Sequence, residues 1–431
     1  MLKCVGGELH IRSRFYSLLL IGVCFLKAVL LAGGYGTRLQ PLTLRLPKVM
    51  VPVAGRPVLE HLIRACATAG IEESVVSLNT NQGVIESYFG GGEKFGIKIS
   101  YVYEDTMSDE DKFGAIGAID YAVRKAGING ECIVINGDNV FYGLDLKRFM
   151  KTHCEKKGGA TIAFFALSDK RDVEQYGIAQ LDGHGRVMRF QEKPKLSEAV
   201  SHLASTGVYH FSESLLKEYL PAFVAKHKKE AKKPDRVGDL WQSFVEEKPI
   251  FGHTFAGMWG DTNSPKTYVE CHKQAMKFLV GRPFSQKFLC KNGDKIIIAA
   301  DTKISEEAII NGPCIIGDGC VVESGATIGS GTHLMNGVRV EKNAVVNGSL
   351  IFEGAVVGQN AKVDDAIVDE KVVLGSNSRI EQYAIVGCSC KIGKNAVVAN
   401  NSKVWPFVEL SDGTILHGDA KVEEKIIAEK L

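Results

Sequence analysis

From about residue 301 onward, the chain carries an aliphatic residue every six positions, a spacing that few folds accommodate. A period of six matches neither the turn of an α-helix nor the alternation of an ordinary strand. It is the period of hexapeptide repeats, whose aliphatic side chains stack inside a parallel β-helix with three repeats per coil. A β-sandwich would not keep this strict spacing. We expect about six to seven coils. The repeat positions are Ile304, Ile310, Ile316, Val322, Ile328, Leu334, Val340, Val346, Ile351, Val357, Val363, Val368, Leu374, Ile380, Val386, Ile392, Val398, Val404, Leu410 and Leu416.

Residues 27 to about 275 follow a different pattern, in which short β-rich runs alternate with helical stretches. This alternation indicates a mostly parallel sheet with helices on both faces. In such sheets, ligands bind at the carboxyl ends of the strands. We therefore expect an α/β Rossmann-like domain over residues 27–275, a connector over 276–300 and the β-helix over 301–431.

The composition excludes several classes of protein. The chain has 431 residues, 45% hydrophobic and 24% charged, which is typical of a globular protein with two or three domains. With a net charge of +2 and one short basic run at 226–236, it offers no general surface for a polyanion, and we expect no nucleic-acid partner. Its eleven cysteines are scattered, a pattern that fits a reducing cytoplasm and neither a disulfide framework nor a zinc site.

The first 26 residues contain the apolar run FYSLLLIGVCFL, preceded by two arginines. The run loosely imitates a signal peptide, but cleavage after it would fall beside the strand that begins at Lys27. It is also short for a membrane span, because Lys27 interrupts it. We expect no membrane segment. Residues 1–26 are either a genuine N-terminal extension or precede a native start near Leu26.

The sequence GGYGTR at 33–38 follows an apolar run and predicts a loop directly after a strand. Backbone N–H groups of a glycine loop can approach phosphates closely, and Arg38 adds two parallel donors. Lys48 adds a mobile positive charge. The loop is not a dinucleotide fingerprint, because Leu39 stands where the third glycine would be, and no G-K-[ST] triplet marks a P-loop.

The full stretch LLAGGYGTRLQPLTLRLPKVMVP at 30–52 closely resembles the start of the sugar-1-phosphate nucleotidyltransferases, whose pattern is approximately L-A-G-G-x-G-T-R-L-x-P-L-T-x-x-x-P-K-x-x-x-P-V. The resemblance covers nearly the whole chain and implies a Rossmann-like domain followed by a left-handed β-helix. It also implies that a sugar 1-phosphate attacks the α-phosphate of a nucleoside triphosphate. The nucleotide-binding residues would be Leu31, Ala32, Gly33, Gly34, Gly36, Thr37, Arg38, Glu104, Gly114 and Gly117.

Two carboxylates lie in motifs that resemble those of the same family. Gly137-Asp138 follows an apolar strand and matches the G-D metal motif, and Trp259-Gly260-Asp261 matches the W-x-D motif. Mg²⁺ takes one or two carboxylates together with substrate phosphates. On this resemblance Asp138 and Asp261 bind Mg²⁺, and the catalytic residues are Arg38, Lys48 and Asp138.

The segment 176–194 resembles the family's Y-G…G-R-V…F-x-E-K-P pattern. The resemblance implies that Glu192 binds sugar hydroxyls and that Lys193 binds the sugar phosphate, roles that suit a carboxylate and an ammonium group. The expected sugar-phosphate site consists of Gly177, Glu192, Lys193 and Gly207.

The sequence leaves the substrate open. The segment GDNVFY at 137–142 resembles glucose-1-phosphate thymidylyltransferases and favours glucose 1-phosphate with dTTP or UTP. The tripeptide VWP at 404–406 instead resembles mannose-1-phosphate guanylyltransferases, and the Glu104 carboxylate would suit the paired donors of guanine.

Two further alternatives concern the kind of protein. The chain could be a non-catalytic regulatory subunit, which its intact motif residues argue against. It could also be bifunctional, with an acyltransferase site in the β-helix, and such a site needs a basic histidine. His333 and His417 are the candidates, and we expect both to face solvent. The expected role of the β-helix is homo-oligomer assembly, because stacked coils present flat faces.

Overall fold

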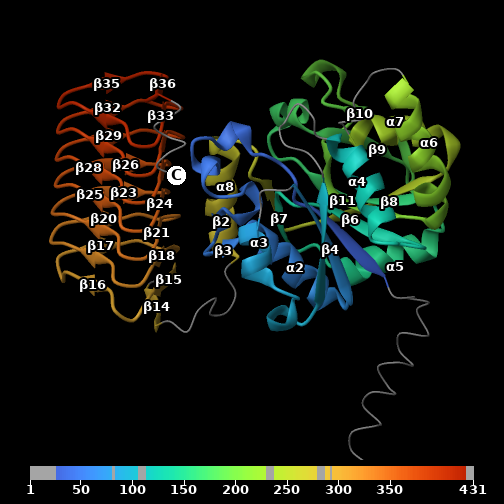
Figure 1. The fold of residues 1–431 in the computed structure, drawn as a ribbon, viewed down its shortest axis with the longest axis horizontal. Helices are drawn as coiled ribbons and strands as arrows, with labels where there is room; N and C mark the ends of the chain where they lie inside the picture. The colour runs from blue at the N-terminus through green and yellow to red at the C-terminus, as the bar shows by residue number, and fades with distance from the viewer. Residues whose placement is uncertain are drawn as a thin grey trace, which may run out of the picture. The chain divides into compact units, whose positions relative to one another are not determined.

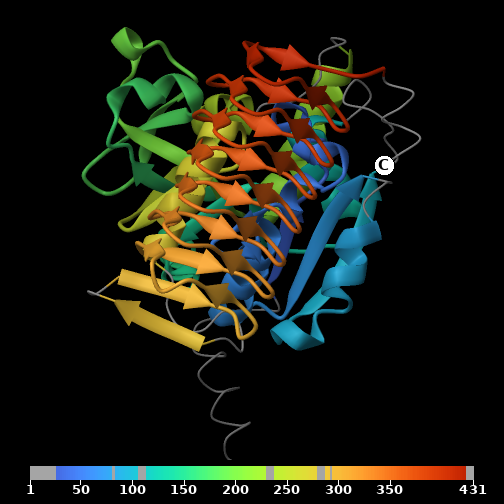
Figure 2. The same cartoon turned by 90° about the vertical axis from the view of Figure 1, so that its left-hand side faces the viewer.

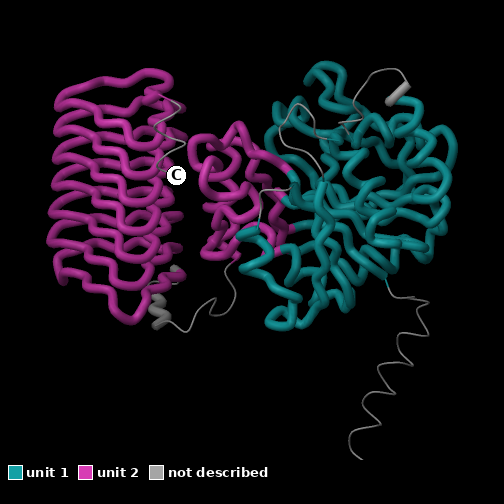
Figure 3. Tube along the Cα trace, viewed as in Figure 1, with its two compact units in different colours: residues 1–33, 62–137, 143–256 teal, residues 34–61, 138–142, 257–431 magenta. Residues whose placement is uncertain are grey.

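The computed structural model describes residues 26–79, 83–104, 113–229, 237–278, 287–291 and 294–423. It contains two compact units, which Figure 3 colours separately. Unit 1 consists of residues 1–33, 62–137 and 143–256, and unit 2 of residues 34–61, 138–142 and 257–431.

Unit 1 is built on one sheet with strand order β10-β9-β11-β6-β1-β4-β5, extended by β8 and β12 (Figure 1). The strands β6, β1, β4 and β5 are parallel, and β11 runs antiparallel to β6. This confirms the Rossmann-like α/β fold, with antiparallel pairing added around β11. The strands are β1 (Lys27–Leu31), β4 (Glu73–Asn79), β5 (Lys98–Glu104), β6 (Cys132–Asn136), β8 (Ala160–Ala166), β9 (Gly177–Leu181), β10 (Val187–Glu192), β11 (Leu203–Phe211) and β12 (Ile250–Phe255).

The helices of unit 1 form where apolar residues recur at helical spacing. In α4, Ile116, Ile119 and Val123 are buried in one core with sheet residues such as Val29 and Val134. Helix α5 begins after Asp145, whose carboxylate accepts hydrogen bonds from two backbone N–H groups of the first turn. The helical segments, of which the first begins in unit 2, are α2 (Val58–Ala69), α3 (Gly83–Phe89), η4 (Glu93–Phe95), α4 (Gly114–Lys125), α5 (Leu146–Lys156), η5 (Lys170–Gln175), η6 (Leu196–Glu198), η7 (Leu215–Tyr219), α6 (Leu220–Lys229) and α7 (Val237–Glu247).

Unit 2 begins with the glycine-rich segment, which folds into three short 3₁₀ turns. Two small antiparallel strand pairs, β2–β3 and β7–β13, and one helix complete this part. Helix α8 starts at Pro265 after a capping box in which Ser264 and Thr267 satisfy each other's backbone groups. The elements are η1 (Thr37–Leu39), η2 (Leu42–Leu44), η3 (Lys48–Met50), β2 (Pro52–Val53), β3 (Arg56–Pro57), β7 (Asn139–Tyr142), β13 (Met258–Asp261) and α8 (Pro265–Lys277).

The rest of unit 2 is a left-handed parallel β-helix whose coils stack in Figure 2. Its three sheets contain nine, seven and seven strands, in line with the expected number of coils. Equivalent strands pair in parallel one coil apart, as Val322 does with Val340. The repeat residues fill the interior, as their spacing predicts. Many corners with positive φ are taken by glycine or asparagine, for example Gly325 (φ 69°) and Asn343 (φ 55°), although Tyr383 (φ 61°) and Phe407 (φ 64°) also adopt this conformation.

The β-helix sheets begin with β14 and β15, within the range 276–300 that the sequence suggests as a connector. The strands are β14 (Lys287–Lys291), β15 (Asp294–Ile298), β16 (Lys303–Ile304), β17 (Ile309–Ile310), β18 (Cys314–Ile316), β19 (Val321–Val322), β20 (Thr327–Ile328), β21 (His333–Leu334), β22 (Arg339–Val340), β23 (Val345–Asn347), β24 (Leu350–Ile351), β25 (Val356–Val357), β26 (Lys362–Asp364), β27 (Ile367–Val368), β28 (Val373–Leu374), β29 (Arg379–Ile380), β30 (Ile385–Val386), β31 (Lys391–Ile392), β32 (Val397–Val398), β33 (Lys403–Val404), β34 (Glu409–Leu410), β35 (Ile415–Leu416) and β36 (Asp419–Ala420).

One outer face of the β-helix is buried within unit 2. On the nine-stranded sheet the residue before each repeat position points outward, and at Ile315, Leu350 and Ile367 this residue is apolar and buried. These side chains share a core with the glycine-rich segment and with α8, represented by Leu39 and Tyr268. The segment with the phosphate-loop motif and the β-helix are therefore packed together.

His333 belongs to this buried face, which corrects the expectation that it faces solvent. It precedes the repeat residue Leu334 on the same sheet and is 7% exposed. Its ring stacks on that of His272 from α8, with centroids 5.7 Å apart. His417 is exposed, as expected.

Burial of His333 predicts that the protein loses stability in acid. Burial lowers the pKa of His333 to about 4 from an ordinary value of 6.5. Between these two pH values the unfolded chain binds a proton that the folded chain does not, so the free energy of unfolding decreases as the pH falls, by about 3 kcal/mol near pH 4. In denaturant titrations from pH 7.5 to 4, the unfolding free energy of His333→Leu should decrease less with falling pH than that of the wild type. His417→Gln should show the wild-type decrease, and the same decrease in all three proteins would contradict the assignment.

Arg45 connects the glycine-rich segment to the β-helix by two ion pairs. Its guanidinium lies 2.9 Å from Asp369 Oδ1 and 2.9 Å from Glu370 Oε1, and the Asp369 side chain is 1% exposed. Arg45→Ala would leave the buried carboxylate without its cation, so we expect a loss of about 3–5 kcal/mol in unfolding free energy by urea titration. The matched control is Arg339→Ala, because Arg339 also faces two carboxylates but is 53% exposed. That variant should lose less than about 1 kcal/mol. Equal losses in the two variants would contradict the account.

Candidate active site

The glycine-rich segment is folded tightly around Gly36. This residue has φ 67°, and a Cβ here would lie 2.9 Å from Thr43 Cγ2 and 3.1 Å from Lys48 Cβ. Thr43 Oγ1 donates a hydrogen bond of 2.8 Å to the carbonyl of Gly36. Because only glycine has both the backbone freedom and the small size, this position fixes Lys48 against the loop.

Lys48 is at the centre of a small group of polar contacts in unit 2. Its Nζ donates to Asp138 Oδ2 at 2.6 Å and to Asn263 Oδ1 at 2.6 Å. The side chain is 9% exposed, so these contacts are largely shielded from solvent. Arg38 Nη2 lies 3.3 Å from the same Asn263 oxygen. The structure therefore brings the predicted residues Arg38, Lys48 and Asp138 together, with Asn263 between the two cations.

The two predicted metal-binding carboxylates lie at one end of a strand pair. Strand β7 runs antiparallel to β13 with Asn139 opposite Asp261. The backbone N–H of Thr262 donates to the carbonyl of Asp138 at 3.1 Å, which places the two aspartates on adjacent chain segments. Trp259 Nε1 donates to Asn139 Oδ1 at 2.9 Å, and Asn139 Nδ2 donates to Asp138 Oδ1 at 2.8 Å. The W-x-D motif thus positions Asp138 through Asn139.

Asp261 also orients Asn263. The Asp261 carboxylate is 3% exposed and its Oδ1 accepts a hydrogen bond of 2.8 Å from the backbone N–H of Asn263. Both carboxylates create a negative potential inside unit 2, because their charges add to burial in raising the pKa of the Cys271 thiol well above its ordinary value. The two carboxylates that the sequence assigns to a metal ion thus place negative charge in this part of unit 2.

Asn263 is a site residue that the sequence motifs did not identify. It lies two positions after W-x-D and directly before Ser264, the N-cap of α8. An asparagine in this place reads as an ordinary turn residue. Only the three-dimensional contacts with Lys48 and Arg38 reveal its place between the two cations.

The nucleotide-binding residues predicted in unit 1 gather at the carboxyl ends of parallel strands. Asn79 and Glu104 are opposite each other at the ends of β4 and β5. Asn79 Nδ2 donates to the carbonyl of Gly33 at 3.0 Å, and a Cβ on Gly33 would lie 3.0 Å from Glu104 Oε1. Glu104 is 5% exposed and accepts a hydrogen bond of 2.8 Å from Ser77 Oγ. Burial raises the pKa of Glu104, and the Ser77 bond opposes this shift.

The remaining predicted nucleotide-binding residues lie on the same loop or on α4. Leu31 ends β1, and Ala32 donates a backbone hydrogen bond of 2.8 Å to the carbonyl of Ser77. A Cβ on Gly34 would meet no atom of the described residues within 4 Å beyond its chain neighbours. Thr37 begins η1, Gly114 begins α4 with φ 73°, and Gly117 lies one turn later, where a Cβ would be 3.1 Å from Phe113 Cβ.

The predicted sugar-phosphate residues in unit 1 fall into two places. Gly177 pairs with Glu192 across β9 and β10, and a Cβ on Gly177 would lie 3.1 Å from Glu192 Oε2. Lys193 follows with φ 49° and an exposed side chain. Gly207 has φ 73° on β11, and a Cβ there would lie 2.7 Å from Asn136 Nδ2, so the glycine makes room for Asn136 of the same chain.

Within the part of the chain that the structure describes, no helix is both long enough and apolar enough to cross a membrane.

Comparisons with known proteins agree with this arrangement. The family model described as nucleotidyl transferase matches residues 27–277, and the model described as GMPPB C-terminal domain matches residues 310–415. The first match covers the predicted α/β domain, and the second covers most of the β-helix.

Curated relatives match over half of the chain or more. A UTP--glucose-1-phosphate uridylyltransferase of Synechocystis sp. is 31% identical over 56% of this chain and 61% of that protein. A mannose-1-phosphate guanylyltransferase of Mycobacterium tuberculosis is 31% identical over 56% of this chain and 62% of that protein. The matches thus span about three fifths of these two relatives. Mannose-1-phosphate guanylyltransferase 1 of Arabidopsis thaliana is 28% identical over 76% of this chain and 86% of its own length.

A solved structure from Bacillus anthracis, described as a glucose-1-phosphate thymidylyltransferase, shares the fold with a TM-score of 0.52 and 22% identity. The alignment covers 60% of this chain and 98% of that one.

Proposed function

Because the chain belongs to the nucleotidyl transferase family, we propose that it transfers the nucleotidyl group of a nucleoside triphosphate to a sugar 1-phosphate, with release of pyrophosphate. The observation that carries this proposal is the contact of Lys48 with both Asp138 and Asn263, beside Asp261 and the glycine loop. This set binds phosphates and a cation and contains no nucleophile–histidine pair, as expected for phosphate transfer between two anions.

Nucleotidyltransferases of this family generally use a divalent metal ion. The residues fit Mg²⁺, because two carboxylates lie at the same end of the β7–β13 pair and oxygen ligands are those that Mg²⁺ prefers. We propose that Asp138 and Asp261 hold it. When bound, Mg²⁺ would neutralise phosphate charge at the reacting α-phosphate.

The chain's own residues supply the positive charge and the orientation. The guanidinium of Arg38 and the backbone N–H groups of the loop 33–38 would bind the triphosphate, and Lys48 would stabilise the charge that develops as pyrophosphate leaves. Asn263 holds both cations in position. No general base is required, since the attacking phosphate oxygen is already an anion, so positioning and charge neutralisation are sufficient.

On the sugar side, we propose that Glu192 accepts hydrogen bonds from sugar hydroxyls and that Lys193 neutralises the sugar phosphate, with Gly177 leaving space beside Glu192. On the nucleotide side, Glu104, Gly114 and Gly117 would contact the base. The proposed contact of Glu104 with the base is supported by the position of its carboxylate beside Gly33, at the carboxyl ends of the strands.

Two substrate pairs have specific support. Glucose 1-phosphate with dTTP or UTP is supported by the GDNVFY segment and by the likeness to a glucose-1-phosphate uridylyltransferase. Mannose 1-phosphate with GTP is the second candidate, supported by the GMPPB C-terminal domain match and by the mannose-1-phosphate guanylyltransferase relatives. The buried Glu104 carboxylate also favours it, because guanine offers two donors on one edge.

Pyrophosphate release over a grid of five nucleoside triphosphates and five sugar 1-phosphates tests the proposal. We expect one pair to exceed all others and the release to require both substrates. No release with any pair would overturn the activity and favour a regulatory subunit instead.

The role of the β-helix remains a proposal. His333 is buried against His272, which argues against it as the base of an acyltransferase. We propose that the coils assemble the chain into a homo-oligomer, because exposed apolar side chains such as Ile309 and Ile415 lie on one of its sheets. Light scattering on the full chain tests this. The eight cysteines whose side chains the structure describes are all free, which supports a cytoplasmic setting.

Substitutions at Arg38 and Lys193 should affect different substrates. Lys193→Ala should raise the KM for the sugar 1-phosphate, since it removes the charge proposed to bind the sugar phosphate. Arg38→Ala should raise the KM for the nucleoside triphosphate. We expect shifts of about tenfold or more, measured with each substrate varied in turn. If both variants affect the same substrate equally, this division of the site is wrong.

A further inference from the structure

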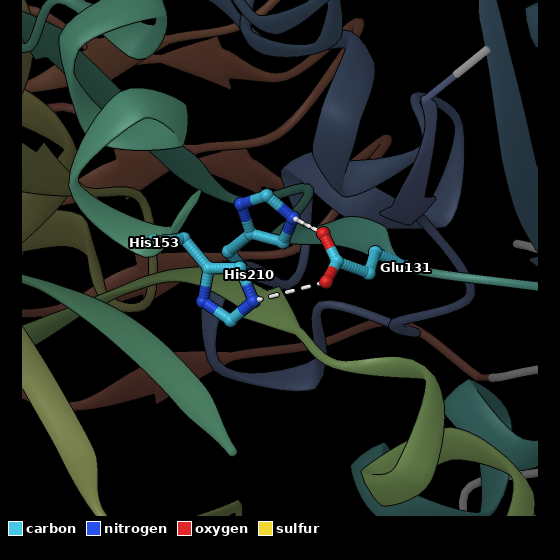
Figure 4. A group of neighbouring side chains, drawn as sticks. All are labelled: Glu131, His153 and His210. Carbon is cyan, nitrogen blue, oxygen red and sulfur yellow. Dashed lines mark ion pairs between the residues drawn. The ribbon is translucent and has the colours of Figure 1, made fainter. Parts of the chain in front are cut away.

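Three side chains with metal-binding atoms meet in unit 1, near the start of β6 and away from Gly137 at its other end. Glu131 directly precedes β6, His153 lies on α5, and His210 lies on β11 (Figure 4). The antiparallel pairing of β11 with β6 places His210 opposite Ile133, one residue into the strand. One ligand atom from each residue lies within 4.8 Å of the others. Among the described residues this is the one group of three such side chains, and the sequence motifs did not identify it.

The two imidazole rings each approach a different oxygen of the Glu131 carboxylate. His153 Nε2 lies 3.7 Å from Glu131 Oε1, and His210 Nε2 lies 3.4 Å from Glu131 Oε2. Figure 4 shows the two rings directing nitrogens at the two carboxylate oxygens. Both distances are long for a hydrogen bond. Ligands held at about 2.0–2.1 Å from one tetrahedral ion lie about 3.3 Å apart, so the two separations suit donors around a shared cation.

Both histidines are buried, and the ring of His210 is without a hydrogen-bond partner in the described part of the chain. His210 is 1% exposed, and neither of its ring nitrogens has a hydrogen-bond partner among the described residues. A buried polar nitrogen without a partner is costly and calls for an explanation. The rings of His153 and His210 are stacked, with centroids 3.9 Å apart, an arrangement that two positive charges would oppose.

The surroundings orient His153 and leave a way in for an ion. His153 Nδ1 lies 2.9 Å from Thr161 Oγ1, which directs Nε2 toward Glu131 in the manner of the outer partners of metal-bound histidines. The Glu131 side chain is 45% exposed, so solvent reaches one side of the group. The thiols of the sequence neighbours Cys132 and Cys154 are not part of this group, so the donor set is two imidazoles and one carboxylate.

We propose that Glu131, His153 and His210 form a binding site for a transition-metal dication, of which Zn²⁺ is the best match. Imidazole nitrogen selects zinc over magnesium, whereas the oxygen ligands of Asp138 and Asp261 suit magnesium. The site is independent of the proposed catalytic metal. It joins the start of β6, helix α5 and strand β11, three segments distant in sequence, and bound metal stabilises unit 1 by mass action.

Zn²⁺ titration of the chelator-treated full chain tests the proposal, in a buffer with a non-chelating reductant. Isothermal titration calorimetry should give one tight site per chain that excess Mg²⁺ does not displace, and the Tm should rise with Zn²⁺. Glu131→Gln keeps the shape of an exposed side chain but removes the anionic ligand. We expect it to weaken this site by at least about 100-fold and to abolish the Tm shift. His153→Gln should do the same.

The matched control is His184→Gln, which removes an exposed histidine of unit 1 and should leave Zn²⁺ affinity unchanged. Co²⁺ gives a second readout, because its visible absorption reports tetrahedral nitrogen and oxygen ligands and a thiolate would add a charge-transfer band. The same Zn²⁺ affinity in the wild type and in Glu131→Gln would overturn the site. A thiolate band that survives Glu131→Gln would assign the metal to cysteines instead and would also overturn it.

Discussion

Asp138→Asn should lower kcat by about 100-fold or more at saturating Mg²⁺, nucleoside triphosphate and sugar 1-phosphate. The Asp138 carboxylate accepts from Lys48 Nζ at 2.6 Å and from Asn139 at 2.8 Å, so it is held in one place beside the glycine loop. An amide of the same shape keeps much of this packing but loses the negative charge that the proposed Mg²⁺ site needs. Pyrophosphate release at saturation measures the effect directly.

The matched control is Asp301→Asn, which changes an exposed aspartate of the β-helix and should keep wild-type kcat. The Tm of Asp138→Asn shows whether the fold survives the change. A well-folded Asp138→Asn protein with kcat within about threefold of the wild type would remove Asp138 from the proposed mechanism.

Lys48→Met should have an effect of similar size, about 100- to 1000-fold in kcat. The ammonium is 9% exposed and donates to both Asp138 and Asn263, and methionine keeps the length of the side chain without its charge. Lys48→Arg should not restore full activity, because a planar guanidinium cannot occupy the compact position of Nζ between two acceptors. Steady-state kinetics with both substrates varied will separate kcat from KM.

Lys266→Met is the matched control, since Lys266 is 57% exposed on α8 and should tolerate the change. A Lys48→Met variant with normal kcat and only a raised KM would show that Lys48 binds the ground state and the transition state equally well.

The fold followed from the sequence because its patterns are local and repeated. A period of six specifies β-helix coils whatever the rest of the chain does, and the alternation of strands and helices specifies the α/β sheet. The period of six does not predict that one outer face of the β-helix is buried, although the apolar residues Ile315, Leu350 and Ile367 lie on that face. The expectation that His333 faces solvent is wrong for this reason, because its ring stacks on that of His272 from α8, which lies outside the repeat.

Short motifs predict the candidate site residues that lie within them. Each motif specifies residue types at a fixed spacing, as in the loop at 33–38, Gly137-Asp138 and W-x-D. The structure brings Arg38, Lys48 and Asp138 together. The motifs do not identify Asn263, because an asparagine before a helix has an ordinary local explanation. Sequence patterns also cannot predict the group of Glu131, His153 and His210, because only the pairing of β11 with β6 and the placement of α5 bring these three residues together.

The central claim is that the α-phosphate of the nucleotide passes to the sugar 1-phosphate. The direct test uses the best substrate pair, with the nucleoside triphosphate labelled at its α-phosphorus, and follows the label by chromatography. We predict that the label appears in a nucleoside diphosphate sugar, one for each pyrophosphate released, and only when the sugar 1-phosphate is present. Label in free nucleoside monophosphate, or release of pyrophosphate without the sugar 1-phosphate, would contradict the account.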